Sequence, residues 1–224
     1  MARKKSRPAN LGGGVIVAAR LSIMRHNIGR LKNFYDEGER HFKRGFKDLE
    51  DEIAHLTDDE IEVFHLEYRD ELEDLREIKR NFSIFGLFTV IERFLRRTLR
   101  HLRKAGAPVE GCIRKMSLEG MKDAFRKIGV PITEPNHDWH ALMGMKEVRN
   151  CIAHYDGHPH KEMAKKLQCD YKIPVIEERW KPANGGKFEP ISWSIQLADE
   201  YFGESAELVE RVCKRAARGY SQFM

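Results

Sequence analysis

The chain has 224 residues, of which 33% are charged and 9% aromatic, and its formal net charge is +5. This length allows one well-packed domain, and the content of large apolar side chains excludes a disordered protein. No stretch approaches the roughly 20 apolar residues of a membrane-spanning helix, and the basic N-terminus lacks the apolar core of a secretory signal. The four cysteines form no CxxC pair, which favours reduced thiols. We therefore expect a cytoplasmic protein without a membrane partner, whose positive charge suits a polyanion.

The N-terminal quarter predicts a basic arm followed by a long helix. Residues 1–14 combine Arg, Lys, Pro and a Gly triplet without periodicity, so we expect them to be disordered. We expect a single helical domain over residues 15–224. From about Val15 to Leu56 the apolar residues recur mostly at spacings of three, four or seven, which predicts a long amphipathic helix.

A second long helix is predicted to begin after Thr57. The stretch "TDDE" has the form of a capping box, with a Glu three residues after the Thr. No Pro interrupts the pattern before Lys104, so the helix could be continuous to that residue. Its acidic residues concentrate at 58–77, whereas its basic residues recur behind an apolar face near the C-terminal end. This basic face, with Arg93, Arg96, Arg97 and Arg100, is either a solvated helix face or a surface that contacts a phosphate backbone such as that of RNA.

The rest of the chain predicts shorter helices and one hairpin. A helix capped by Ser117 is expected to stop near Gly129, and another is expected to begin at Asn136 or Asp138. Between Ile173 and Leu197 partly alternating apolar residues surround "ANGG", a hairpin-turn signal. A C-terminal helix follows. The predicted fold is all-α: a bundle of four or five helices, two of them long and N-terminal, with a small β-hairpin before the last helix.

The stretch "EVRNCIAHYDG" at 147–157 ends the helix that begins near Asn136. On a helical wheel, the apolar residues Ala141, Met145, Val148, Ile152 and Tyr155 form one stripe. Arg149, Asn150 and His154 fall outside that stripe, so we expect them to face away from the core of their own subunit.

Two spacings within this motif matter for chemistry. Asn150 and His154 are four residues apart, so the amide can hold the imidazole and fix its tautomer. Arg149 and His154 are five residues apart and do not converge on one ideal helix. They can meet at one phosphate only through a distorted last turn or through a second copy of the helix.

At these residues the sequence resembles the HEPN superfamily. "RNCIAH" fits the R-N-x-x-x-H form of its signature, and "FSIFGLFTVIERFL" is similar to the long helix that packs against the motif helix. The resemblance implies a helical bundle and, for many members, a metal-independent endoribonuclease whose site forms across a homodimer. It also implies a toxin or antiviral-defence role, often with an inhibitory or activating protein partner. The alternative is a HEPN-like module that binds RNA or protein without catalysis.

The residue types fit metal-free RNA cleavage, in which the 2′-OH attacks its own phosphate. A histidine can serve as base or acid near neutral pH, and an arginine offers a planar, charged fork to the phosphate. We therefore predict that His154 is the general base or acid, that Arg149 stabilises the transition state, and that Asn150 orients the site. The expected partners are RNA and a second copy, which docks through the motif helix.

Several nearby residues have both a functional and a structural interpretation. Glu92 could orient Arg149, or it could pair with a neighbouring arginine such as Arg96. Lys146, His158 and His160 are candidate RNA contacts. The spacing of the histidines is not a specific ligand pattern, so we expect no metal and no cofactor.

Overall fold

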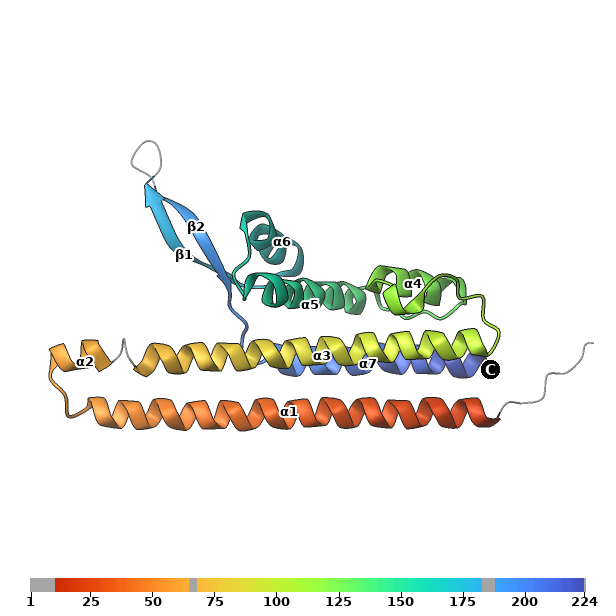
Figure 1. Cartoon of the computed structure of the whole chain (residues 1–224), viewed down its shortest axis with the longest axis horizontal. Helices are drawn as coiled ribbons and strands as arrows, with labels where there is room; N and C mark the ends of the chain where they lie inside the picture. The colour runs from red at the N-terminus through yellow and green to blue at the C-terminus, as the bar shows by residue number, and fades with distance from the viewer. Residues whose placement is uncertain (1–10, 65–67, 183–187, 224) are drawn as a thin grey trace, which may run out of the picture. The chain divides into compact units, whose positions relative to one another are not determined.

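The computed structural model describes residues 11–64, 68–182 and 188–223 (Figure 1). These residues are overwhelmingly helical, and they contain one antiparallel pair of strands, which directly precedes the C-terminal helix. The all-α prediction with a small hairpin is therefore confirmed. The described residues form seven α-helices rather than four or five, because the sequence pattern missed one short helix and merged two others.

The first helix, α1, spans Leu11–Ile53. It begins four residues before the predicted start, so that Leu11 and the Gly triplet belong to the helix. Residues 1–10, most of the predicted arm, lie outside the described residues. The buried side chains of α1 recur at spacings of seven and four and are Val17, Met24, Ile28, Tyr35 and Phe42. The helix buries a narrow stripe, which is why Ile23, predicted to face inward, is exposed.

The predicted second long helix consists of two helices in the structure. The first, α2, spans Asp58–Phe64, and the second, α3, spans Asp70–Lys104. Residues 65–67 lie outside the described residues, and Tyr68 and Arg69 form a π-helical turn that leads into α3. The capping box before α2 is present, because the Glu60 carboxylate accepts hydrogen bonds from the Thr57 N–H at 2.9 Å and from its hydroxyl at 2.6 Å. The acidic residues thus begin two helices rather than one.

The middle of the chain contains three shorter helices. Helix α4, Leu118–Lys127, follows a short 3-10 turn at Ile113–Lys115 and is capped as predicted by the Ser117 hydroxyl. Helix α5 spans Asn136–Tyr155. Helix α6, Lys161–Tyr171, was not predicted; its N-terminus is capped by the His160 imidazole, which accepts a hydrogen bond from the N–H of Met163. Imidazole is an unusual cap, so no ordinary start signal marks this helix in the sequence.

The hairpin consists of β1, Val175–Pro182, and β2, Phe188–Ile195. Val175 lies opposite Ile195, and the register shifts twice around Arg179. The "ANGG" turn lies outside the described residues. Helix α7, Tyr201–Phe223, follows and begins three residues later than predicted.

The contacts within the chain group into two compact units. Unit 1 contains Met1–Asn27, Thr89–Leu142 and Glu207–Met224, and unit 2 contains Ile28–Phe88 and Met143–Ala206. Helices α1, α3, α5 and α7 each contribute residues to both units. No helix in the described part of the chain has a stretch long and apolar enough to cross a membrane.

Unit 1 contains a buried carboxylate. Asp138 is one of the two predicted starts of α5, but the helix begins two residues before it. Its oxygens instead bind two arginines of α7, with Arg211 Nη2 at 3.0 Å and Arg215 Nη1 at 2.7 Å. Burial alone would raise the pKa of Asp138, but the hydrogen bonds from the two guanidiniums lower it below its usual value. A carboxylate can be buried here because two cations neutralise it.

Unit 2 has its own ion-pair cluster between α1 and α3. The Glu39 carboxylate binds Arg76 at 2.6 Å and Arg80 at 2.8 Å, and Asp199 also pairs with Arg80. Burial would raise the pKa of Glu39, but hydrogen bonds from Arg80 and Arg76 outweigh it and hold that pKa at about 2. Paired charges therefore join α1 to the first half of α3.

This cluster predicts a loss of stability in acid. Because the pKa of Glu39 falls from about 4.5 to about 2 on folding, its contribution is complete above pH 4.5 and is lost as pH falls towards 2. The shift corresponds to roughly 3 kcal/mol at most. We expect Glu39→Gln to lower the free energy of unfolding by about that amount at pH 7, with the difference shrinking below pH 4. Urea titrations at pH 7 and pH 3 measure this, with Glu37→Gln as the exposed control. Equal losses at both pH values would contradict the expectation.

Candidate functional site

The R-N-x-x-x-H motif lies in the last two turns of α5, in unit 2. After Tyr155 the backbone enters the left-handed region at Asp156 (φ 51°) and Gly157 (φ 82°). The N–H of Gly157 then donates back to the carbonyl of Cys151 at 3.4 Å. Glycine adopts such a φ at little cost, so its place after the helix explains where the helix ends. The motif histidine is thus held one residue before the helix end.

The buried face of α5 differs from the predicted stripe. From Leu142 onwards the buried side chains of α5 are Leu142, Met145, Val148 and Cys151, whereas Tyr155 is exposed and Ile152 is only half-buried. The predicted stripe was therefore correct at Met145 and Val148 and wrong at its ends. The buried face includes Cys151, and burial raises the pKa of its thiol to about 12. That thiol is a core group and not a nucleophile.

Arg149 does not face away from unit 2, contrary to the prediction. It is half-buried, and its guanidinium lies over two aromatic rings of α3, 5.6 Å from the centroid of Phe85 and 5.0 Å from that of Phe88. Nη1 also donates to the Asn150 side-chain oxygen at 3.0 Å. An arginine has enough donors to keep this position and still bind a phosphate oxygen. The cation is therefore positioned by stacking on α3.

His154 is exposed, as predicted, at the end of the motif helix. Within the described part of the chain its imidazole makes no hydrogen bond, and its ring contact is an edge contact with Tyr155 at 6.4 Å between centroids. The predicted hydrogen bond between Asn150 and His154 is absent, and the Asn150 oxygen accepts a hydrogen bond from Arg149. Tyr155 in turn contacts the ring of His160 at 5.4 Å. Two imidazoles thus flank one exposed tyrosine ring.

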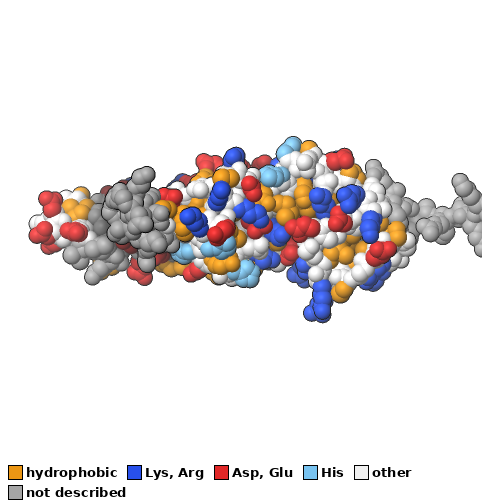
Figure 2. Space-filling model, turned by 90° about the horizontal axis from the view of Figure 1, so that it is seen from above, with side chains coloured by type: hydrophobic (Ala, Val, Ile, Leu, Met, Phe, Trp, Pro, Cys, Tyr) orange, Lys and Arg blue, Asp and Glu red, His pale blue; other side chains and the backbone are white. Residues whose placement is uncertain are grey.

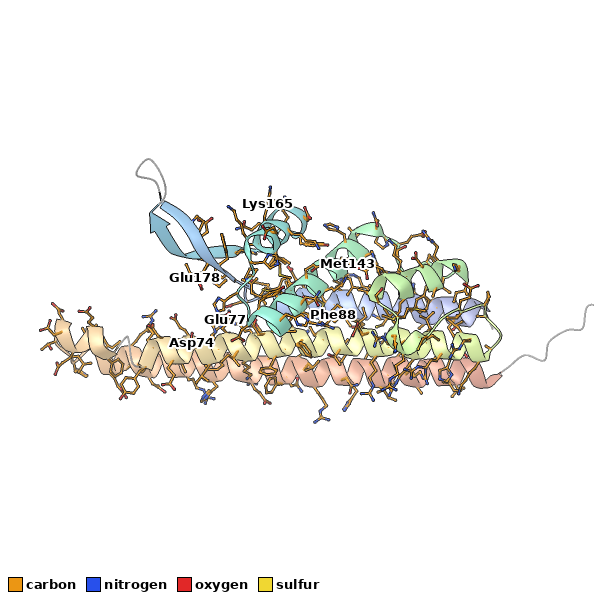
Figure 3. The ribbon with its side chains drawn as sticks, turned by 45° about the horizontal axis from the view of Figure 1, so that its top comes forward. Asp74, Glu77, Phe88, Met143, Lys165 and Glu178 are labelled. Carbon is orange, nitrogen blue, oxygen red and sulfur yellow. The ribbon has the colours of Figure 1, made fainter. Side chains whose placement is uncertain are left out.

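A polar cluster that the sequence did not predict lies beside the helix end. An added Cβ at Gly157 would lie 3.5 Å from the Glu77 carboxylate and 3.6 Å from the Asn81 amide, both on α3. Burial raises the pKa of Glu77. A hydrogen bond with Asn81 and the charge of His158 partly offset this rise. Figure 3 shows Glu77 on α3 and Glu178 on the hairpin. Only the pairing of distant helices brings this carboxyl to the motif, so no local pattern signalled it.

The direction of α5 relative to α3 follows from these contacts. Arg149 lies at the level of Phe85 and Phe88, and Gly157 lies at the level of Glu77 and Asn81. The two helices therefore run in opposite directions along this contact. By interpolation, His154 lies near the level of Phe82.

The other histidines of "HYDGHPH" each have a nearby carboxylate. His158 Nδ1 lies 3.5 Å from Glu178, and His160 Nδ1 lies 3.0 Å from Glu162. Among the described residues, no group of three or more His, Cys, Asp or Glu side chains could hold a metal ion. Histidines come to the surface beside basic and acidic side chains on the face shown in Figure 2. His158, His160 and the half-buried Lys146 remain candidate RNA contacts.

The predicted arginine surface lies on α3 in unit 1. Arg93, Arg97 and Arg100 make no ion pair within the described residues, whereas Arg96 binds Glu92 at 3.3 Å and the Met116 carbonyl at 3.1 Å. The structural interpretation of Glu92 as a partner of Arg96 is therefore confirmed. Glu92 lies in unit 1 and Arg149 in unit 2, and a pairing between those two stays a prediction.

Helix α1 adds a cation to this surface that the sequence did not indicate. The guanidinium of Arg20 donates to the Arg97 carbonyl at 3.2 Å and contacts the Nε2 atom of His101. Burial, followed by the charges of Arg97 and Arg100, lowers the pKa of Arg20. A pocket of about 100 Å³ opens among Arg20, Arg93 and Arg97. Cations without carboxylate partners gather there.

A larger pocket of about 330 Å³ lies in unit 2 beside the Glu77 cluster. Its lining includes Arg69, Arg76 and Arg80, but each of these guanidiniums pairs with a carboxylate. Its charges are thus already balanced, which makes it a weaker anion site than the surface in unit 1.

Comparison of the chain with family models, with curated proteins and with solved structures found no match. The resemblance to the HEPN superfamily therefore stays a prediction that depends on the motif residues.

Proposed function

We propose that this protein is a metal-independent endoribonuclease of the HEPN type. His154 acts as general base or acid, Arg149 binds the phosphate and stabilises the transition state, and Asn150 holds Arg149. A second copy completes the site by supplying its own motif. The product is a 2′,3′-cyclic phosphate with a 5′-OH on the other fragment.

One observation carries the proposal: an exposed imidazole without a hydrogen-bond partner among the described residues stands five residues from a preset arginine on the same helix. A general base must be free to reach the hydroxyl that it deprotonates, and His154 has that freedom. Arg149 is held by Phe85, Phe88 and Asn150 before any substrate arrives. A preset cation loses little freedom when it binds a phosphate.

The role of Asn150 changes from the prediction. Its oxygen accepts a hydrogen bond from Arg149 and so orients the arginine rather than the histidine. Tyr155 and His160 then lie next to His154 and offer flat rings on which an RNA base could stack.

RNA binding is expected to depend on the arginines that lack carboxylate partners. The test is a variant with Arg93, Arg97 and Arg100 all changed to Gln. The logarithm of the RNA association constant should then decrease less steeply with the logarithm of the salt concentration. We expect the magnitude of that slope to be smaller by about 2, since each phosphate contact on single-stranded RNA contributes about 0.7. Fluorescence anisotropy with a labelled RNA at several salt concentrations measures this. The control is Arg126→Gln, an exposed arginine paired with Asp123. An unchanged slope in the triple variant would rule this surface out.

The proposed reaction is tested by incubating the purified protein with end-labelled RNA in EDTA. We expect shorter fragments that carry a 2′,3′-cyclic phosphate, which acid opens and which phosphatase alone does not remove. Cleavage that needs Mg²⁺, or fragments with a 3′-OH, would contradict the proposal.

A second candidate is a non-catalytic HEPN-like module that binds RNA or protein. The observation that favours it is the engagement of Arg149, whose guanidinium is already satisfied by two rings and an amide. Such a module would retard RNA on a gel without shortening it. We further propose a toxin or defence role, in which a protein partner restrains or activates cleavage.

A further inference from the structure

Helix α3 carries an apolar stripe that unit 2 leaves exposed. Leu75 is 50% exposed, Ile78 50%, Phe82 68% and Phe85 38%. Their spacings of three, four and three are those of the a and d positions of a coiled coil. Soluble chains seldom expose such a continuous apolar row, so a row of this kind marks an interaction surface.

The residues on both sides of this stripe belong to unit 2. On one side, Lys79 of α3 lies 4.5 Å from the ring of Phe34 on α1, which is itself an exposed aromatic residue. On the other side, Phe85 contacts Arg149 of α5. The stripe therefore lies between the residues of α3 that contact α1 and those that contact the motif helix α5. On this side α3 is exposed.

We infer that this stripe binds the same stripe of a second copy in antiparallel orientation. With the two-fold axis midway between Ile78 and Phe82, Ile78 lies opposite Phe82 of the second copy and Leu75 lies opposite Phe85. The four residues of each stripe then form four pairs across the interface. Every pair is apolar, and in each pair a phenylalanine faces a smaller side chain. The self-complementary pattern is what identifies the occupant as another copy of this chain.

Charge favours the antiparallel over the parallel orientation. Along α3 the same face continues to Glu71 on one side and to Thr89, Glu92 and Arg96 on the other. A parallel pair would place Glu71 against Glu71, which is repulsive. The antiparallel pair places Glu71 opposite Thr89 and so avoids this like-charge contact.

This orientation also has a consequence for catalysis, and that part rests on the proposed function. Because His154 lies near the level of Phe82, it lies close to the level of the two-fold axis. An antiparallel two-fold keeps both α5 helices on the same side of the α3 pair, whereas a parallel two-fold separates them. The two motifs therefore flank one groove. The dimer forms through α3, with the motif helix at its edge rather than at its centre.

The oligomeric state of the full chain tests the interface without reference to activity. We expect light scattering to give twice the chain mass of 26.1 kDa and Phe82→Asp or Ile78→Asp to give a monomer with unchanged circular dichroism. Ile176→Asp, at an exposed residue of β1 in the same unit, should stay dimeric. A monomeric parent chain, or a dimer that survives both stripe variants, would overturn the inference.

Disulfide trapping tests the orientation. In a background with the exposed Cys112 and Cys169 changed to Ser, copies with Ile78→Cys should crosslink to copies with Phe82→Cys. Copies that all carry Phe82→Cys should crosslink far less. The opposite preference would establish a parallel pair and overturn the antiparallel register. A trapped antiparallel dimer that does not cleave RNA would leave the interface standing and count against the proposed function alone.

Discussion

Replacing His154 with Ala is expected to lower RNA cleavage in EDTA by about 10²–10⁴-fold, the usual contribution of a general acid or base. The side chain is exposed and makes no hydrogen bond within the described residues, so its loss should not disturb the fold. Single-turnover cleavage of a labelled RNA measures the rate, and circular dichroism measures the fold. RNA affinity should change little, because the imidazole acts on the reaction and contributes little charge to binding.

The matched control for this prediction is His137→Ala. His137 is an exposed histidine on the same helix, but it lies in unit 1, away from the motif. Its variant should cleave at the parent rate. Undiminished cleavage by His154→Ala would show that cleavage uses a different group.

Replacing Arg149 has the second largest expected effect. Arg149→Ala should lower cleavage by about 10²–10³-fold, the typical cost of removing a preorganised cation from the transition state. Arg149→Lys should recover only part of that loss, because an ammonium group cannot form the planar fork that binds two phosphate oxygens. The comparison of Ala with Lys separates the need for charge from the need for geometry.

The same substitution tests the structural role of Arg149. Its guanidinium lies over Phe85 and Phe88, so Arg149→Ala should also lower the free energy of unfolding by about 0.5–2 kcal/mol. Thermal unfolding measures this, with the exposed Arg30→Ala as the control. A loss of stability with unchanged cleavage would show that Arg149 has a structural role alone. Loss of cleavage at full RNA affinity would favour the nuclease.

Several elements were predictable because their signals are local. The capping box at Thr57, the Ser117 cap and the apolar periodicity of α1 each depend on residues a few positions apart. These patterns predicted the all-α fold, two long helical segments and the hairpin. The prediction failed where local signals were weak. Helix α6 begins at a histidine cap, which is not an ordinary start signal.

The sequence by itself therefore determined where most of the helices form and which residues carry the motif Arg149, Asn150 and His154. Only the tertiary structure decided what those residues contact. Because α5 packs on α3, the Arg149 guanidinium lies over two phenylalanine rings. The Asn150 oxygen accepts a hydrogen bond from Arg149, and His154 stays exposed. A helical wheel supplies angles around one axis, whereas a contact depends on which neighbour lies at each angle. That neighbour comes from a segment some 60 residues away, which no local spacing encodes.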